Sequence, residues 1–134
     1  MAIRISDRRF IRERAHSRCE YCRMCEAWEP YFIYHTEHIM ARQHGGSDAL
    51  ENLAFACNHC NALKGPNLTS VDPDTDKVTA LFHARADVWD THFRIEDGQI
   101  RGLTAIGRTT VFLLQMNTPQ RIELRMENAD EERR

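Results

Sequence analysis

Two Cys-x-x-Cys pairs constrain this chain more than any other feature of its sequence. Cys19 and Cys22 form the first pair, and Cys57 and Cys60 form the second. The two-residue spacer lets a tight turn direct both thiolates at one metal ion, and two such pairs supply the four ligands of a tetrahedral zinc site. Four thiolates leave no open coordination position, so we predict a structural zinc ion. We expect the fifth cysteine, Cys25, to be a free thiol, with a role as an alternative zinc ligand as the other possibility.

Length and composition predict a small globular protein. A chain of 134 residues is expected to form one domain, with a core motif over residues 18–65 and an extension over residues 66–134. An odd number of cysteines argues against a disulfide framework. No apolar run approaches the roughly 20 residues that span a bilayer, and the arginine-rich start lacks the apolar segment of a signal peptide. We therefore expect a cytoplasmic protein without a membrane partner, and the sequence indicates no oligomeric state.

The charge is unevenly distributed, although the formal net charge is only −2. Residues 1–23 contain seven arginines against three acidic residues. A local basic field can attract phosphate groups even on a protein that is neutral overall. An arginine-rich helix face that is simply solvated explains the same pattern, and the sequence leaves both interpretations open.

The middle of the chain predicts the order strand, loop, strand, helix. Before this middle segment, Ser6 is expected to be the N-cap of a helix that runs to about His16. Residues 31–34 are aromatic or β-branched and, together with residues 35–39, predict a strand, and the apolar run at 53–56 predicts its partner. A helix of about two turns is expected over residues 58–64, because a glycine and a proline follow it.

The second half predicts further helices and a hairpin. Residues 68–77 are expected to form a loop, and residues 84–90 one or two helical turns. The Asp-Gly dipeptide at 97–98 predicts a hairpin over residues 93–102. Thr104 is expected to cap a helix over residues 105–116, and Pro119 to start the last helix. The core candidates of the helix at 105–116 are Ile106, Val111, Leu113 and Leu114.

A set of short motifs follows in fixed order between the two cysteine pairs. The chain reads Cys19-x-x-Cys22, Glu37-His38-Ile39, Gly45-Gly46-Ser47-Asp48, Asn52-Leu53, Cys57-x-x-Cys60-Asn61 and Lys64-Gly65. In this order and spacing the segment resembles the HNH endonuclease family in its four-cysteine, zinc-bound form. The resemblance implies an α+β fold, a ββα-metal (His-Me finger) core with a structural zinc. An N-terminal helix would flank this core on one side, and a hairpin with helices on the other.

The resemblance also implies an activity, the metal-dependent hydrolysis of phosphodiester bonds in DNA. His38 would be the general base that activates water, since a neutral imidazole can accept a proton near pH 7. Glu37 and Asn61 would hold a catalytic Mg²⁺ or Mn²⁺, which prefer oxygen ligands. Asn52 would hold the loop that orients His38. The family often has histidine where this chain has Asn61, which leaves the preferred catalytic metal open.

The remaining candidates are contacts to the phosphate backbone. Lys64, Arg42 and His44 lie beside the motif residues and could contact nucleic acid. One difficulty is that Glu37 and His38 are adjacent on the expected strand, where successive side chains point to opposite faces. A zinc-stabilised nucleic-acid-binding module without catalysis is the alternative function. A scaffold domain whose active residues are vestigial is a third possibility.

Overall fold

The computed structural model describes residues 3–132, which fall into two compact units. Unit 1 comprises Met1–Leu68 and His83–Asp87, and unit 2 comprises Thr69–Phe82 and Val88–Arg134. Both units mix helices with small two-stranded sheets, which agrees with the expected α+β class. The organisation as one domain over 1–134 stays a prediction. Among the described residues, no helix has the length and apolarity that crossing a membrane requires.

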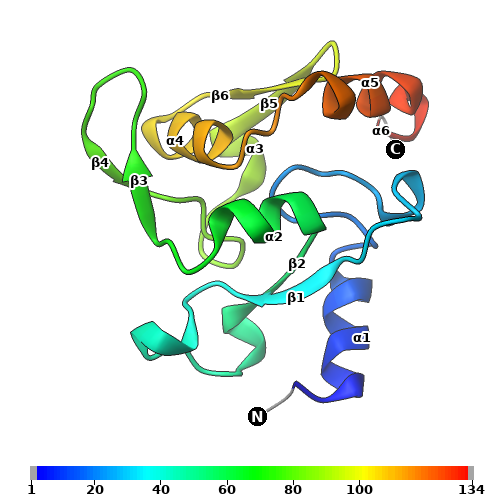
Figure 1. Cartoon of the computed structure of the whole chain (residues 1–134), viewed down its shortest axis with the longest axis vertical. Helices are drawn as coiled ribbons and strands as arrows, with labels where there is room; N and C mark the ends of the chain where they lie inside the picture. Colours follow the sequence, from blue (N-terminus) through cyan, green and yellow to red (C-terminus); the bar gives the residue numbers. More distant parts are fainter. Residues whose placement is uncertain (1–2, 133–134) are drawn as a thin grey trace. The chain divides into compact units, whose positions relative to one another are not determined.

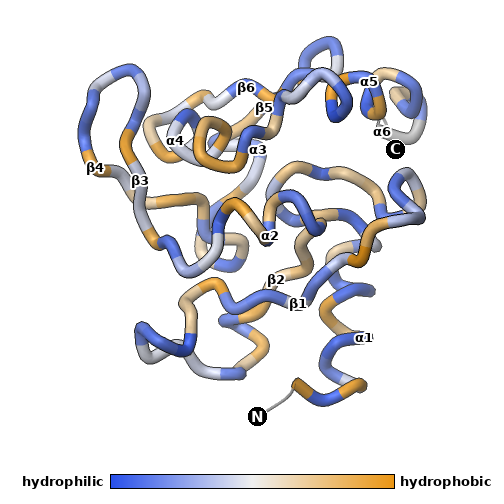
Figure 2. Tube along the Cα trace, viewed as in Figure 1, coloured by the Kyte–Doolittle hydropathy of each residue, from blue (hydrophilic) through white to orange (hydrophobic). Residues whose placement is uncertain are grey.

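Unit 1 begins with helix α1, Ile5–Arg14, which agrees with the helix predicted there. Its N-cap is Arg4 instead of Ser6, because the Arg4 carbonyl accepts hydrogen bonds from the backbone N–H groups of Asp7 and Arg8. Ile11 is fully buried, whereas Phe10 is partly exposed. Hydrophilic and hydrophobic stretches alternate along α1 in the hydropathy view (Figure 2).

The centre of unit 1 is a short hairpin followed by a helix (Figure 1). Strand β1, His35–His38, pairs antiparallel with β2, Leu53–Ala56, and helix α2, Asn58–Lys64, follows directly. Short 3-10 helices, Glu26–Trp28, Arg42–His44 and Leu50–Asn52, lie in the connecting loops. The strand predicted at 31–39 is shorter than expected because β2 offers only four residues for pairing. Three exposed residues therefore precede β1: Tyr31, Phe32 and Ile33.

The segment His83–Asp87 belongs to unit 1 although it is distant in sequence. Its Arg85 forms an ion pair with Glu20, which lies between the first two cysteines. Glu20 also pairs with Phe55 of β2, donating its backbone N–H to the Phe55 carbonyl at 2.9 Å and accepting the Phe55 N–H on Oε2 at 2.8 Å. Burial lowers the pKa of Arg85 to about 10, so its guanidinium is charged at neutral pH. Arg85 thus ties this later segment to the first cysteine pair.

Unit 2 contains two hairpins. Strands β5, Phe93–Glu96, and β6, Gln99–Gly102, form the hairpin predicted from the Asp-Gly turn. The stretch expected to be a loop instead contributes to a second hairpin, in which β3, Thr69–Val71, pairs with β4, Val78–Ala80. Its turn is held by the buried Asp72, whose carboxylate accepts two hydrogen bonds from Arg108 and one from Thr75. These contacts lower the pKa of Asp72 to about 2.

Four helices complete unit 2: α3, Trp89–His92, α4, Ala105–Leu113, α5, Pro119–Glu127, and α6, Ala129–Glu132. Thr104 caps α4 as predicted, because its hydroxyl accepts the Gly107 N–H. Of the four predicted core residues, Leu114 is buried just after α4, and Ile106, Val111 and Leu113 are half-buried. The fully buried residues within the helix are Gly107, Thr109 and Thr110, which lie at helical spacing on the same face as Ile106 and Leu113.

Small residues allow the buried side of α4 to pack closely against neighbouring backbone. A Cβ atom at Gly107 would lie 2.1 Å from the His92 carbonyl oxygen, so only glycine permits this close approach. The Thr110 hydroxyl accepts the Phe82 N–H at 2.9 Å and donates to the Ile106 carbonyl. A buried threonine therefore supplies a hydrogen bond that an apolar side chain could not.

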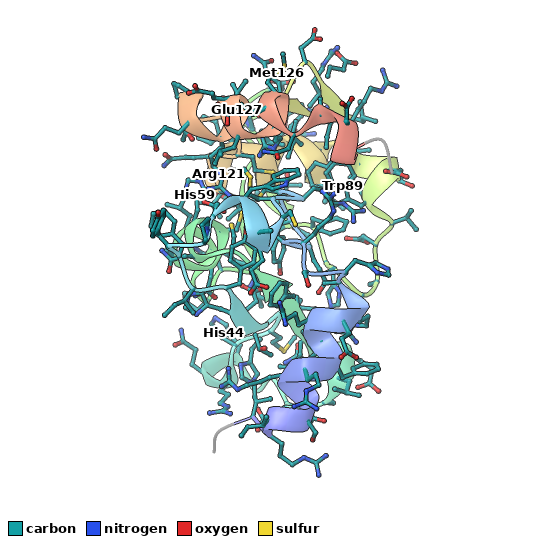
Figure 3. All side chains as sticks on the ribbon, turned by 90° about the vertical axis from the view of Figure 1, so that its right-hand side faces the viewer. His44, His59, Trp89, Arg121, Met126 and Glu127 are labelled. Carbon is teal, nitrogen blue, oxygen red and sulfur yellow. The ribbon has the colours of Figure 1, made fainter. Side chains whose placement is uncertain are left out.

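Helix α5 likewise buries charged residues. Arg121 and Arg125 are buried, and Arg125 donates hydrogen bonds to the carbonyls of Gly98 and Met116. Arg121 lies on the inner side of the helix, whereas Met126 and Glu127 lie on its outer side (Figure 3). Arg125 thereby satisfies backbone carbonyls at the β5–β6 turn and just after α4.

Candidate active site

The four cysteines predicted as zinc ligands converge in unit 1. Their Sγ atoms all lie within 4.8 Å of one another, and all four side chains are buried. The Sγ atoms of Cys22 and Cys57 are 3.7 Å apart, close to the separation of about 3.8 Å that Zn–S bonds of about 2.3 Å give in a tetrahedron. Burial and the neighbouring sulfurs raise the pKa of Cys19 and of Cys60, so a cation is needed to hold four thiolates here.

Backbone N–H groups support this cluster. Cys57 is the N-cap of α2, and its Sγ accepts the Cys60 N–H at 3.3 Å. The Sγ of Cys19 accepts the N–H groups of Tyr21 and Cys22 in the same way. Cys25 lies outside the cluster and is half-buried. The cluster therefore fits a closed structural site for zinc, made by the two cysteine pairs alone.

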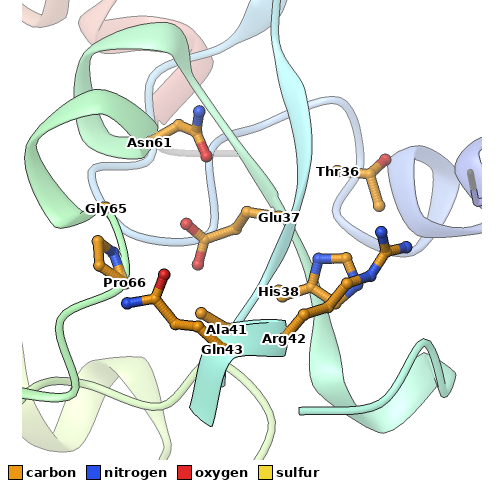
Figure 4. A pocket seen from close by; sticks show the side chains of 9 residues that line it. All are labelled: Thr36, Glu37, His38, Ala41, Arg42, Gln43, Asn61, Gly65 and Pro66. Atoms are coloured by element: carbon orange, nitrogen blue, oxygen red, sulfur yellow. The ribbon is translucent and has the colours of Figure 1, made fainter. Parts of the chain in front are cut away.

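A pocket of about 410 Å³ opens beside β1 and the end of α2 (Figure 4). Glu37, His38 and Asn61, which were predicted as catalytic residues, all line this pocket. Glu37 and His38 both border this pocket although they are neighbours on β1 and their side chains leave the strand on opposite sides (Figure 4). The other lining residues are Thr36, Ala41, Arg42, Gln43, Gly65 and Pro66.

Glu37 occupies the inner wall of the pocket and is only 6% exposed. Its Oε1 accepts a hydrogen bond from the Tyr21 hydroxyl at 2.5 Å and lies 3.4 Å from the Lys64 ammonium. Burial raises the pKa of Glu37, whereas the charge of Lys64 and the hydrogen bond from Tyr21 oppose this rise. The carboxylate is therefore held by two groups inside the protein.

His38 is oriented by the loop that follows β1. Its Nε2 lies 2.7 Å from Oδ1 of Asp48, and the Arg42 guanidinium contacts both oxygens of the same carboxylate, at 3.0 and 3.2 Å. The hydrogen bonds from His38 and Arg42 lower the pKa of Asp48. An ionised Asp48 can only accept, so Nε2 carries the proton and Nδ1 is the free acceptor of the neutral imidazole.

Asn52 closes that loop with three hydrogen bonds to the backbone. Its side chain accepts the Met40 N–H and donates to the carbonyls of Met40 and Ser47, at 2.8–2.9 Å. Met40 lies two residues after His38, and Ser47 directly precedes Asp48. The amide thus holds both segments that carry the His38–Asp48 pair, and its role in orienting His38 stays a prediction.

Gly46 is the tightest point of this loop, and it supplies a first prediction. A Cβ atom there would lie 1.7 Å from the Met40 carbonyl oxygen, whereas at Gly45 the space is open. We expect Gly46→Ala to lower the free energy of unfolding by about 1–3 kcal/mol, because the backbone must shift. Gly45→Ala is the matched control and is expected to cost about 1 kcal/mol, since Gly45 has a φ of 88°. Urea denaturation measures both, and an equal or smaller loss for Gly46→Ala would contradict the predicted clash.

The three predicted phosphate contacts differ in position. Arg42 lines the pocket and is exposed. His44 is exposed on the 3-10 helix Arg42–His44 but does not line the pocket. Lys64 is only 2% exposed, with its ammonium donating to the Ile39 carbonyl at 3.0 Å and facing Glu37. This burial does not fit the phosphate contact predicted for Lys64, and the side chain instead neutralises Glu37.

Two side chains in the site were not predicted as functional residues, Tyr21 and Asp48. Asp48 belongs to the Gly-Gly-Ser-Asp motif, so the sequence draws attention to this residue. The sequence does not show that the partner of Asp48 is His38. Tyr21 stands between two zinc ligands, where its contact with Glu37, sixteen residues away, leaves no local signal. Both contacts depend on the tertiary fold.

Comparison with protein families agrees with the sequence motifs. Residues 19–67 match the family described as HNH endonuclease, a segment shorter than half of the chain. Neither the curated proteins nor the solved structures gave a match. The match contains both cysteine pairs and all the pocket-lining residues, and it indicates a nuclease-type or nucleic-acid-related function. The predicted resemblance is thereby confirmed: residues 19–67 of this chain are similar to the HNH endonuclease family and place four cysteines to bind one zinc ion.

Proposed function

We propose that this protein is a metal-dependent endonuclease of the ββα-metal type that hydrolyses phosphodiester bonds in DNA. The observation that carries the proposal is that Glu37, His38 and Asn61 all line one open pocket. An imidazole with a defined acceptor, a buried carboxylate and an amide oxygen are the groups that a water-activating, cation-assisted hydrolysis requires. The strand–strand–helix arrangement of β1, β2 and α2 presents all three.

His38 acts as the general base in this proposal. Asp48 holds Nε2–H, so that Nδ1 accepts the proton of the attacking water while the imidazole becomes an imidazolium. The Asp48 carboxylate stabilises that positive charge, and Asn52 holds His38 and Asp48 in place through its hydrogen bonds to the backbone of Met40 and Ser47. Arg42, at the pocket rim, binds a phosphate oxygen of the backbone.

Glu37 and Asn61 are the residues that would hold Mg²⁺ or Mn²⁺. Oxygen ligands suit these cations, and a pocket of this size also admits the water molecules that they retain. A bound cation would supply charge neutralisation at the phosphate and at the leaving 3′ oxygen. We expect products with 5′-phosphate and 3′-hydroxyl ends.

Plasmid cleavage tests the proposal. Zinc-loaded protein is incubated with supercoiled plasmid without and with added Mg²⁺ or Mn²⁺, and the topological forms are separated by electrophoresis. We expect relaxed or linear DNA only when a cation is added, and nicks that a DNA ligase can seal. DNA binding without cleavage under every cation would support the non-catalytic module instead. Neither binding nor cleavage would support the scaffold.

A further inference from the structure

Tyr21 links the cysteine cluster to the pocket. It lies between Cys19 and Cys22, is fully buried, and donates its backbone N–H to the Cys19 Sγ. At the other end of the side chain, its hydroxyl donates to Oε1 of Glu37 at 2.5 Å. One residue therefore contacts both the structural metal site and the carboxylate of the proposed catalytic site.

The turn that carries Tyr21 is itself fixed. The preceding Glu20 is held to Phe55 of β2 by hydrogen bonds in both directions and to Arg85 by an ion pair. Strand β2 pairs with β1, in which Glu37 lies opposite Ala54. The turn and the strand that bears Glu37 are thus positioned against the same element, which leaves the phenol little freedom to move away from the carboxylate.

Both partners of Glu37 approach the same oxygen. The Tyr21 hydroxyl and the Lys64 ammonium contact Oε1 at 2.5 and 3.4 Å, and Lys64 is itself anchored on the Ile39 carbonyl. This arrangement leaves Oε2 as the oxygen that Glu37 can present to the pocket that it lines. A carboxylate held by one oxygen offers its other oxygen in a single orientation.

We propose that Tyr21 is a positioning residue for Glu37, and that it fixes the carboxylate so that Oε2 faces a divalent cation in the pocket. The inference rests on the proposed function, since Glu37 is the ligand there. The zinc cluster then has a second consequence besides stability, because it sets the position of the phenol and through it the geometry of the cation site. Tyr21 contacts neither substrate nor cation in this account.

Binding of Mn²⁺ in the absence of DNA tests this role. Tyr21→Phe keeps the buried ring and removes only the hydroxyl. Tyr34→Phe is the matched control, since the Tyr34 hydroxyl also donates to a carboxylate, Glu29, and is buried in the same unit away from the pocket. Free Mn²⁺ is measured by electron paramagnetic resonance, together with zinc content and thermal unfolding for each protein.

We expect Tyr21→Phe to weaken Mn²⁺ binding about tenfold, the scale of one hydrogen bond to a charged group. Tyr34→Phe should bind Mn²⁺ as the wild type does, and both variants should retain one zinc per chain. In cleavage, Tyr21→Phe should need about tenfold more Mn²⁺ for half-maximal rate, and saturating Mn²⁺ should restore the rate to within about twofold, because the ligand itself is present.

Three results would overturn the inference. Unchanged Mn²⁺ affinity in Tyr21→Phe, with wild-type binding and cleavage intact, refutes the positioning role alone. An equal loss in Tyr34→Phe, or loss of zinc from Tyr21→Phe, assigns the effect to general destabilisation. A wild-type protein that neither binds Mn²⁺ nor cleaves DNA refutes the proposed function and this inference together.

Discussion

Replacing His38 with alanine is expected to lower the cleavage rate by about a hundredfold to ten-thousandfold, the contribution typical of a general base. The fold should survive, because His38 is partly exposed and its contact goes to Asp48, an exposed residue of the following loop. Single-turnover cleavage of a labelled duplex at saturating Mn²⁺ measures the chemical step. The binding of DNA should change little, since the lost group accepts a proton and carries no phosphate contact.

A histidine on the same strand provides the control for this experiment. His35 is the first residue of β1, its Nε2 is hydrogen-bonded to the Asn58 side chain, and it does not line the pocket. His35→Ala should therefore cleave at nearly the wild-type rate. Wild-type cleavage by His38→Ala would exclude His38 as the base, and a similar loss in both variants would point to damage of β1.

Removal of zinc is expected to have the largest effect on stability. Metal binding by four thiolates supplies about 10 kcal/mol or more of folding free energy, which is the scale of the whole stability of a small domain. Cys57→Ser should therefore lose the metal and unfold the region around β2 and α2. Zinc content by mass spectrometry and hydrogen exchange of peptides covering residues 53–64 measure the two effects.

The fifth cysteine is the matched control for the zinc prediction. Cys25→Ser changes the same atom outside the cluster, so one zinc per chain and slow exchange of residues 53–64 should persist. If Cys57→Ser retained zinc and slow exchange, the four-thiolate site would be wrong. If Cys25→Ser lost zinc, Cys25 would have to be counted among the ligands.

Features fixed by local chemistry were predictable from the sequence. The spacing of Cys57 and Cys60 predicted a shared metal site, Gly65 predicted the end of α2, and Thr104 predicted the start of α4. Each of these signals involves residues within a few positions of one another. The motif order also carried enough information to predict the family that residues 19–67 match.

Features fixed by distant partners were not predictable. Apolar periodicity did not predict that Gly107 and Thr110 are the buried residues of α4, because it cannot show that the Thr110 hydroxyl satisfies the Phe82 N–H or that Gly107 meets the His92 carbonyl. The sequence also did not show that Lys64, predicted as a phosphate contact, is buried, since its partner, Glu37, lies on another element. In each case a polar group is buried because a specific partner is there to receive it.

The ion pair between Arg85 and Glu20 also bears on how the segment that matches the family could be transferred to another protein. The family match ends at residue 67, but the guanidinium that pairs with Glu20 in the first cysteine turn belongs to Arg85. A fusion protein that contained only residues 19–67 would include the whole motif but lack Arg85. The Glu20 carboxylate would then have lost the guanidinium with which it forms an ion pair. The transferable module thus extends beyond the motif and is discontinuous along the chain.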